Sequence, residues 1–402
     1  STDDISLGHT RLSIIDLSKA ANQPMSNDED SLRIVYNGEI YNYLDIRKEL
    51  EKKNVQFKTK SDCEVVLKAY EIWGKDCLKK FNGMFSFAIH NLSDRSIFIA
   101  RDRVGIKPLY YYQIENKILF ASEIKSILQY KGIQPKLNSE LLPDYFMFRY
   151  IPTEETFFKG IKKFPPGHFG IIRKNTNIEI NRYWDITPNY SKSEKSENYY
   201  FEKFTYLLED SVQKRLMSDV PFGMYLSGGL DSTVILSLMQ EMMSSPVKTY
   251  SVDFVPKVGE GLAAQEMASR YSTIHKDITV TEDDLELLPK ILFHLDEPQG
   301  DAIILPSYKL AQQATKDVKM VLTGEGADEI LTGYQFFKVL HYMYKYFPLL
   351  KVLRFGLSIS PQFLINKLSN HPGHFGNKSK NRMLDIIKNK QLSYIQKLEK
   401  MI

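Results

Sequence analysis

The sequence predicts an α+β domain followed by an α/β domain built on a parallel sheet. Three observations support this prediction. Strand-like segments joined by short turns dominate residues 1–130, and strand-like and helix-like segments alternate over residues 201–402. Between them, residues 131–200 are rich in proline and polar side chains. We therefore expect two domains joined by a connector.

Strands of the first domain are expected to pair antiparallel. Alternating, β-branched and aromatic residues predict strands at 32–40, 84–91, 96–102, 109–114 and 117–122. The turn NLSDR joins two of these strands as a hairpin would. Apolar spacing predicts helices at 43–54 and 64–74. Hairpin-linked strands with few helices favour an antiparallel sheet.

The connector and the second domain follow. Prolines in the connector stand at Pro135, Pro143, Pro152, Pro165, Pro166 and Pro188. The polar run NYSKSEKSEN, residues 189–198, is the expected linker. After a helix at 201–217, strands are predicted at 223–227, 247–255, 275–280 and 319–324, with helices at 232–243, 263–271 and 306–316. This alternation predicts a parallel sheet flanked by helices.

Composition and charge exclude several protein classes. With 43% hydrophobic and 25% charged residues the chain is globular, and a net charge of +4 is too small to indicate a nucleic-acid partner. Two cysteines, Cys63 and Cys77, fit a reducing compartment without a disulfide framework. No apolar run approaches the ~20 residues that cross a bilayer. We expect a cytoplasmic protein without a membrane partner.

Residues 330–384 contain no acidic residue, and their lysines and arginines are interleaved with aromatic residues. We expect core helices here. A surface for an anionic ligand or a lipid headgroup, centred on residues 335–384, is the alternative.

The most informative stretch is SGGLDS, which follows an apolar strand and opens a helix. A turn of this kind exposes backbone N–H groups at the positive end of a helix dipole, where a phosphate binds. Gly228 and Gly229 allow close approach, and Ser227 and Ser232 add hydroxyl donors. Asp231 fits if Mg²⁺ lies between it and the phosphates. Because the lysine of a P-loop is absent, we expect pyrophosphate held as a leaving group.

A second strand and loop, KMVLTGEGADEILTGY at 319–334, support this interpretation. Thr323 and Gly324 could cap the sugar or the base of a nucleotide. Glu325, Asp328 and Glu329 crowd three carboxylates into one turn, which favours a cation or a cationic substrate group there. A solvated acidic turn is the alternative.

SGGLDS together with TGEGADE resembles the ATP-pyrophosphatase half of the asparagine synthetase family. Motifs that resemble the glutaminase half of the same family are LGHTRLSIIDLS, NGEIYN, SDCEVV, GMFSFAI, RDRVGIKPLYY, ASEIKS and PPGH. The match covers nearly all of residues 5–335, in family order.

The resemblance implies both fold and reaction. It implies an N-terminal-nucleophile glutaminase domain, an αββα sandwich, over residues 1–130. A Rossmann-like ATP-pyrophosphatase domain would occupy residues 201–402. Glutamine would be hydrolysed in the first domain, and its ammonia would displace AMP from an acyl-adenylate in the second. ATP and Mg²⁺ are the implied cofactors, and a homodimer is one arrangement that the resemblance allows.

In the glutamine pocket, the resemblance implies that Arg11 grips the substrate α-carboxylate, while Glu39 and Asp62 pair with its ammonium group. Asn37 and the backbone N–H of Gly38 would stabilise the oxyanion and are the catalytic candidates here. Residues beside the arginine would complete the pocket: Leu12, Ser13, Ile14 and Ile15. Without the resemblance, a surface ion pair and a β-turn would explain Arg11 and the NGE segment as well.

The family's nucleophile is a cysteine at the start of the mature chain, whereas this sequence begins with Ser1. Cys63 lies beside Asp62, whose charge is expected to raise the pKa of the thiol, so we expect Cys63 and Cys77 to be packing residues. The family's later arginine-proline-leucine-aspartate motif and catalytic lysine are not found after residue 335. We therefore expect a fragment that lacks both ends and does not hydrolyse glutamine by itself.

For the nucleotide site, the resemblance implies adenine contacts at Leu226 and Val252, and a catalytic carboxylate at Glu325 beside the acyl-adenylate. The remaining nucleotide-binding residues are expected to be Ser227, Gly228, Gly229, Asp231, Ser232, Thr323 and Gly324, with Asp231 and Asp328 as metal ligands. The loop DEPQGDAIILP, residues 296–306, is family-like as well. Its acids could bind the amino group of the acceptor, or they could simply be solvated.

The acceptor is expected to be aspartate, although relatives that amidate a cell-surface sugar uronic acid or cyclise β-lactams share the same motifs. Two competing hypotheses are a nucleotide-binding relative without catalytic activity and a hydrolase that acts alone. The retained SGGLDS turn argues against the hydrolase, which would have no use for a phosphate-binding loop.

Overall fold

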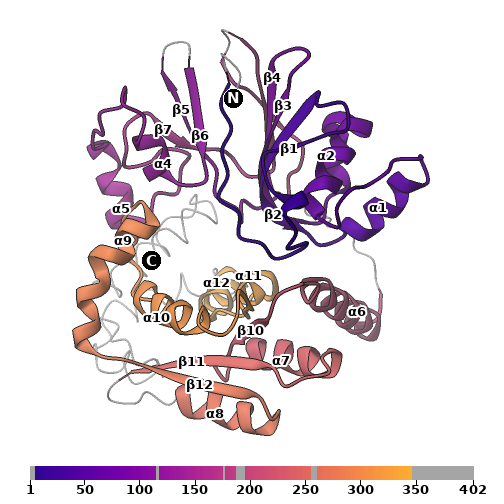
Figure 1. Cartoon of the computed structure of the whole chain (residues 1–402). Helices are drawn as coiled ribbons and strands as arrows, with labels where there is room; N and C mark the ends of the chain where they lie inside the picture. The colour runs from indigo at the N-terminus through magenta and orange to yellow at the C-terminus, as the bar shows by residue number, and fades with distance from the viewer. Residues whose placement is uncertain (1–4, 115–116, 175–176, 187–194, 255–259, 346–402) are drawn as a thin grey trace. The chain divides into compact units, whose positions relative to one another are not determined.

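A computed structural model describes residues 5–114, 117–174, 177–186, 195–254 and 260–345 (Figure 1). The chain divides into two compact units, Ser1–Thr323 and Gly324–Ile402. The strands and helices predicted for the two regions of the first unit are confirmed, with shifts of a few residues at their ends.

One antiparallel sheet of six strands forms the centre of the N-terminal region, in the order β1-β2-β3-β4-β8-β9. Its strands are β1 (Met25–Ser26), β2 (Leu32–Ile40), β3 (Gly83–Asn91), β4 (Ser96–Arg101), β8 (His168–Ile172) and β9 (Glu179–Arg182). Helices α1 (Tyr43–Glu51), α2 (Asp62–Trp73) and α3 (Cys77–Lys80) accompany it. Apolar side chains of β2, β3 and α2 share one core that includes Ile34, Leu67 and Phe85.

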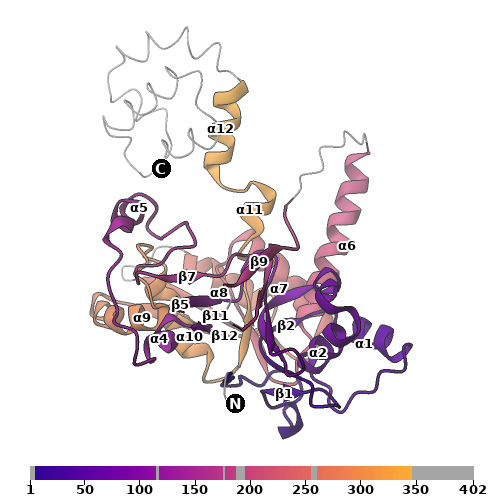
Figure 2. The ribbon, with the colours of Figure 1, turned by 90° about the horizontal axis from the view of Figure 1, so that it is seen from above.

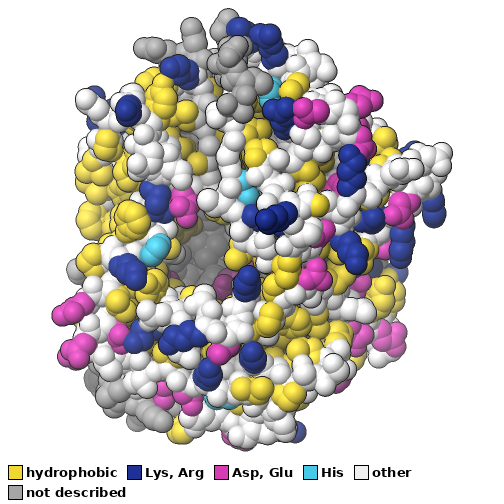
Figure 3. Space-filling model, in the orientation of Figure 1, with side chains coloured by type: hydrophobic (Ala, Val, Ile, Leu, Met, Phe, Trp, Pro, Cys, Tyr) yellow, Lys and Arg dark blue, Asp and Glu magenta, His cyan; other side chains and the backbone are white. Residues whose placement is uncertain are grey.

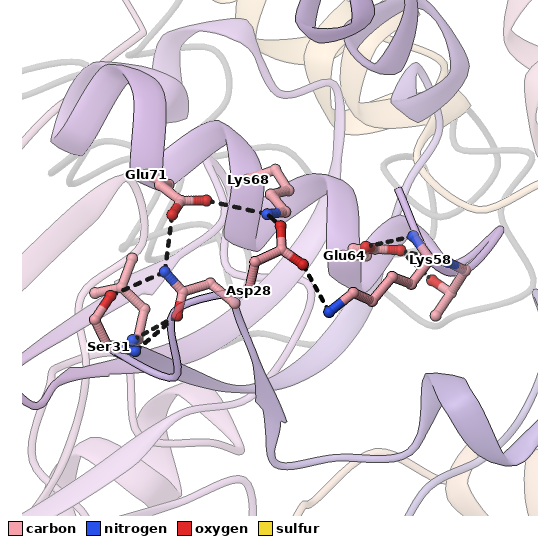
Figure 4. Close-up of polar contacts among 9 residues, drawn as sticks. Asp28, Ser31, Lys58, Glu64, Lys68 and Glu71 are labelled. Carbon is pink, nitrogen blue, oxygen red and sulfur yellow. Dashed lines mark hydrogen bonds and ion pairs between the residues drawn. The ribbon is translucent and has the colours of Figure 1, made fainter. Parts of the chain in front are cut away.

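A polar network lies beside this core, where the buried ammonium group of Lys68 on α2 reaches Asp28 and Glu71 (Figure 4). In the same view Glu64 accepts hydrogen bonds from the backbone N–H groups of Lys58 and Thr59, at 2.9 and 2.7 Å. These bonds fix the segment that leads into α2.

A second antiparallel sheet has the order β6-β5-β7. It consists of β5 (Tyr110–Ile114), β6 (Lys117–Ala121) and β7 (Ile161–Lys163), with α4 (Ile124–Leu128) packed against it. Strands β7, β8 and β9 come from the segment expected to be a connector, which also holds α5 (Leu142–Phe148). Most of the linker predicted at 189–198 lies outside the described residues.

The C-terminal region of the first unit contains a parallel sheet in the order β12-β11-β10-β13. Its strands are β10 (Phe222–Tyr225), β11 (Lys248–Phe254), β12 (Ile274–Val280) and β13 (Met320–Leu322). The helices are α6 (Glu197–Arg215), α7 (Leu230–Met242), α8 (Glu260–Arg270), α9 (Leu288–Leu295) and α10 (Ile304–Ala314). Helices α6, α7 and α8 share a core with Met224 and Leu322, whereas α10 packs with Tyr250. Helices therefore cover both faces, as the alternation predicted.

Helix α6 begins with exposed aromatic side chains, including Tyr200 and Phe201, and its first turns extend away from the sheets in Figure 2. On the face shown in Figure 3, basic and acidic side chains are interspersed. Short 3₁₀ turns occur at Lys19–Ala21, Gly74–Asp76, Ser139–Leu141 and Glu282–Leu287.

In the second unit the described helices are α11 (Ala327–Leu331) and α12 (Gln335–Lys345). Helix α12 begins the basic and aromatic segment predicted to be helical, and residues 346–384 of that segment lie outside the described residues. Over the described part of the chain, no helix combines the length and apolar character that a bilayer crossing requires.

Candidate functional site

A cavity of about 610 Å³ opens in the N-terminal region of the first unit. Most of its lining comes from three places: the segment before β1, the second half of β2 with the start of α2, and β6 with α4. The residues predicted to bind glutamine line this cavity, except for Ser13. They are Arg11, Leu12, Ile14, Ile15, Asn37, Gly38, Glu39 and Asp62.

Arg11 is held by the backbone of its own loop. Its guanidinium group donates to the carbonyl oxygens of Ile15, at 2.9 Å, and Ser18, at 3.2 Å, and also to that of Asp16. Carbonyl groups orient the guanidinium without neutralising it. Because these contacts use three of its five N–H donors, Arg11 retains the charge and the donors to bind a carboxylate.

Asn37 and Gly38 lie in β2, opposite Ser86 and Phe85 of β3. The side-chain amide of Asn37 donates to Oγ of Ser122 at 3.3 Å, which directs it toward the β6 wall. At Gly38 an added Cβ would lie 2.4 Å from the carbonyl oxygen of Met84. Only glycine therefore allows β2 and β3 to approach this closely next to the cavity.

Asp62 is the first residue of α2, and Ser61 caps this helix by accepting from the N–H of Cys63 at 3.1 Å. Its carboxylate is buried and accepts from the hydroxyl of Tyr36 at 2.6 Å and from the N–H of Ile40 at 3.1 Å. Both donors come from β2, so the strand and the helix jointly orient this carboxylate.

Glu39 is also buried. Burial, and then the charge of Asp62, raises the pKa of Glu39 to about 8, although Lys107 acts in the opposite direction. Burial likewise raises the pKa of Asp62. Two buried carboxyl groups that resist ionisation together favour a cation between them. With Arg11 on the same cavity, the charges are those that would bind a free amino acid at its two ends.

Several lining residues were not singled out from the sequence. They are His9, Gln23, Tyr36, Lys107 and, on the β6 and α4 wall, residues 118–123, Ser126, Ile127 and Tyr130. Lys107 belongs to the RDRVGIKPLYY motif, and membership of that motif is the only sequence feature that could have indicated it as a cavity residue. The carboxylate of Asp102 holds it in place by accepting from the N–H groups of Ile106 and Lys107, both at 2.9 Å.

Both cysteines are packing residues, as predicted. Cys63 touches the cavity but is only 1% exposed, and burial, followed by the charge of Asp62, raises the pKa of its thiol well above the usual value. Cys77 is fully buried, and burial raises its pKa too. Both side chains belong to the apolar core of the N-terminal region.

The SGGLDS turn is built around its two hydroxyl groups. Oγ of Ser227 and Oγ of Ser232 lie 3.0 Å apart, and the N–H of Gly229 donates to Oγ of Ser227 at 3.3 Å. Gly228 has a positive φ of 72°, and an added Cβ would lie 2.6 Å from the backbone of Ala263 and Ala264. Position 228 therefore requires glycine, because of both its backbone conformation and the close approach of α8.

This turn lies at the switch point of the parallel sheet. The chain passes from β10 to β11 and β12 on one side and later returns to β13 on the other side of β10. Ser227 and Thr323 follow the carboxyl ends of β10 and β13, which are neighbours. Open α/β sheets bind ligands at this position.

The two expected adenine contacts, Leu226 and Val252, differ in how deeply their side chains are buried. Leu226 is 1% exposed and belongs to the core shared with α7 and α8. Val252 is only partly buried and packs with Val280, Ile291 and Leu305. A base could meet the side chain of Val252, but only the main chain of Leu226.

Asp231 lies in the first turn of α7 and is partly exposed. The described residues include no cluster of three or more side chains suited to a metal. Mg²⁺ commonly uses one or two carboxylates together with phosphate oxygens and water, so Asp231 beside the turn fits that role.

The other acidic loop belongs to the second unit, apart from Thr323, which ends the first. Gly324 and Glu325 precede α11, and Asp328 lies in its first turn. Asp328 is packed against Gly333, whose N–H donates to its carbonyl oxygen at 3.0 Å. Glu329 accepts from the hydroxyl of Tyr334 at 2.7 Å.

Two acids of the DEPQGDAIILP loop have structural contacts. Asp296 accepts from the N–H of Ile124 at 2.7 Å, and Glu297 accepts from the N–H of Phe157 at 2.8 Å. These two carboxylates are therefore held by the backbone of the N-terminal region and are not simply solvated.

Two protein families match this chain, one in its N-terminal half and one in its C-terminal half. Residues 1–184 match the glutamine amidotransferase domain family, and residues 203–398 match the asparagine synthase family. The chain is 37% identical over 339 residues to asparagine synthetase (glutamine-hydrolyzing) 1 of Bacillus subtilis, covering 84% of this chain and 53% of that protein. It is 38% identical over 353 residues to a Methanocaldococcus jannaschii protein named provisionally as asparagine synthetase (glutamine-hydrolyzing) 2, covering 82% of this chain and 67% of that protein.

Amidase chyE of Penicillium rubens is also similar, at 34% identity over 353 residues, covering 83% of this chain and 52% of that protein. The chain therefore spans between about half and two thirds of the length of these relatives.

Proposed function

The chain belongs to the family of glutamine-hydrolysing asparagine synthetases, and on that premise we propose that the protein uses ATP and the ammonia of glutamine to amidate a carboxylate. Aspartate is the proposed acceptor, activated as a β-aspartyl-adenylate with release of pyrophosphate. The observation that carries this proposal is the cavity lined by Arg11, Glu39 and Asp62, whose charges match the two charged groups of glutamine.

In the glutamine half, Arg11 binds the α-carboxylate through its unused N–H donors. Glu39 and Asp62 bind the ammonium group, whose charge offsets the repulsion between them. The carboxamide then lies toward Asn37 and Gly38, whose N–H groups stabilise the oxyanion of the attacked amide. We further propose that this domain has the N-terminal-nucleophile αββα fold, which two antiparallel sheets with flanking helices support.

In the nucleotide half, backbone N–H groups of the turn formed by Ser227, Gly228 and Gly229 bind the pyrophosphate of ATP at the start of α7. Asp231 would hold Mg²⁺, which offsets the charge that develops on the departing pyrophosphate. Ser232 shapes the turn, and the backbone of Leu226 with the side chain of Val252 borders the base. From the sequence motif, Thr323 and Gly324 are proposed as nucleotide contacts as well.

Two further roles are proposed from the motif alone: Glu325 as the carboxylate beside the acyl-adenylate, and Asp328 as a metal ligand. Their place in the family motif TGEGADE is what supports these roles. A cytoplasmic location and a homodimer stay predictions.

The test is product analysis with the complete natural protein, MgATP, aspartate and either ammonium chloride or glutamine. We expect asparagine, AMP and pyrophosphate in equal amounts from both nitrogen donors. Release of pyrophosphate only with a sugar uronic acid would refute aspartate as the acceptor.

Asp231→Asn should abolish pyrophosphate release and leave glutamine binding intact, because the two sites use different residues. Glu241→Gln, near the other end of α7, is the matched control and should behave as the natural protein does. Nucleotide binding by Asp231→Asn equal to that of the control would refute the metal role.

A further inference from the structure

Two residues of the C-terminal region of the first unit bind to the walls of the proposed glutamine cavity, which lies in the N-terminal region. We infer that Asp296 is a positioning residue for the α4 wall and that Asp219 has the same role for the loop at residues 14–16. This inference rests on the proposed function of the cavity.

Helix α4 does not cap itself. Its N-cap residue, Glu123, makes no side-chain hydrogen bond to the helix, so the first N–H groups of α4 need other acceptors. Asp296 supplies them, with Oδ2 accepting from Ile124 at 2.7 Å and Oδ1 from Lys125 at 3.2 Å. A residue far along the chain thus performs the capping that usually falls to an adjacent one.

The Asp296 carboxylate is well fixed for this task. Its side chain is 7% exposed, and it forms an ion pair with the ammonium group of Lys125 at 2.9 Å. Asp296 follows α9 with a positive φ of 66°, a conformation that non-glycine residues adopt rarely. The chain therefore accepts backbone strain at the position that places this carboxylate against α4.

Helix α4 forms part of the cavity wall. Ser126 and Ile127 of this short helix line the cavity, as does Glu123 just before it. If the first turn of α4 loosens, these side chains lose their fixed positions, and the cavity loses the shape of this wall.

The loop at residues 14–16, of which Ile14 and Ile15 line the cavity, has a similar connection. Oδ2 of Asp219 accepts from the N–H of Asp16 at 2.8 Å, and the N–H of Asp219 donates to the carbonyl oxygen of Ile14 at 3.1 Å. Arg11 donates to the carbonyl oxygens of this same loop. Asp219 lies three residues before β10, the strand that leads into the SGGLDS turn.

The experiment compares Asp296→Ala with Lys125→Met, which removes the ion pair but keeps both backbone bonds to Asp296. We expect Asp296→Ala to weaken glutamine binding about tenfold, measured by titration calorimetry, because two backbone donors lose a buried acceptor. Lys125→Met should change the dissociation constant less than about twofold. For Asp219, we expect about threefold weaker binding in Asp219→Ala and recovery in Asp219→Asn, which keeps an acceptor oxygen.

Pyrophosphate release driven by ammonium chloride should be unchanged in all four variants, because it does not use the glutamine cavity. An equal loss of both activities in Asp296→Ala would mean a merely structural role and would overturn the inference.

Hydrogen exchange of the α4 amides separates this inference from the proposed function. In Asp296→Ala, the N–H groups of Ile124 and Lys125 should exchange at least about tenfold faster than in Lys125→Met. Unchanged exchange refutes the inference, whereas failure of the unaltered protein to bind glutamine refutes the proposed function.

Discussion

The hydroxyl of Tyr36 lies 2.6 Å from Oδ2 of Asp62, inside the cavity that we assign to glutamine. A donor this close favours the ionised form of the Asp62 carboxylate, whose pKa burial raises. Tyr36 therefore favours the negatively charged form of Asp62, which is the form that would pair with the ammonium group of the substrate.

Tyr36→Phe removes that donor and leaves the ring in place. We expect the pKa of Asp62 to rise further and the dissociation constant for glutamine to increase about five- to tenfold, which titration calorimetry at pH 7.5 would measure. Tyr206→Phe, at an exposed position on α6, is the control and should bind as the unaltered protein does. Equal affinity in both variants would contradict the role assigned to Tyr36.

Glu39 makes stability depend on pH. Burial, followed by the charge of Asp62, raises its pKa to about 8 in the folded protein, from 4.5 in the unfolded chain. The folded state therefore retains a proton that the unfolded state releases, so the resulting stability is present below pH 4.5 and is lost as the pH rises through 8.

Glu39→Gln cannot ionise and should escape this loss. We expect a free energy of unfolding about 2–4 kcal/mol higher than that of the unaltered protein at pH 8.5, and little difference near pH 5. Urea unfolding at both pH values measures this, with the exposed Glu29→Gln as the control. A variant no more stable at pH 8.5 would show that Glu39 ionises without cost.

Gly38→Ala tests the close approach of β2 and β3. The added Cβ would lie 2.4 Å from the carbonyl oxygen of Met84 and 2.8 Å from Cα of Phe85, both backbone atoms that cannot rotate away. We expect a loss of about 2–4 kcal/mol in the free energy of unfolding. Gly8→Ala is the matched control because no atom lies within 4 Å of its added Cβ. Similar stability of the two variants would contradict the packing described for β2.

Lys68 is the buried member of the network in Figure 4, with 6% of its side chain exposed, compared with 73% for Lys58. We expect Lys68→Ala to lower the free energy of unfolding by about 2 kcal/mol, because Asp28 and Glu71 lose the cation between them. Lys58→Ala should cost less than about 0.5 kcal/mol, since its ion pair is solvated. Urea unfolding at pH 7 measures the stability of both variants. Equal losses would disprove the larger contribution assigned to Lys68.

The stabilising effect of the same network depends on pH in the acid range. Hydrogen bonds from Lys58 and then Lys68 lower the pKa of Asp28 from 3.8 to about 2. Its contribution to stability is therefore present above pH 3.8 and disappears as the pH falls through 2.

The sequence alone determined the order of elements and the parallel sheet, and it predicted the chemistry of both loops. These features depend on short-range patterns: alternation in β2, apolar spacing in α2, and glycines and hydroxyls within SGGLDS. A residue such as Arg11 or Gly38 could be named because its motif carries the signal within a few positions.

Only the tertiary structure decided what surrounds those motifs. Tyr36 meets Asp62 from another element, strands β7 to β9 join sheets begun much earlier in the chain, and Asp296 caps a helix 172 residues before it. A carboxylate bonds equally well to water, a substrate or a backbone N–H group, so its local sequence cannot tell which partner it meets. Burial and long-range packing make that choice, and no spacing pattern records it.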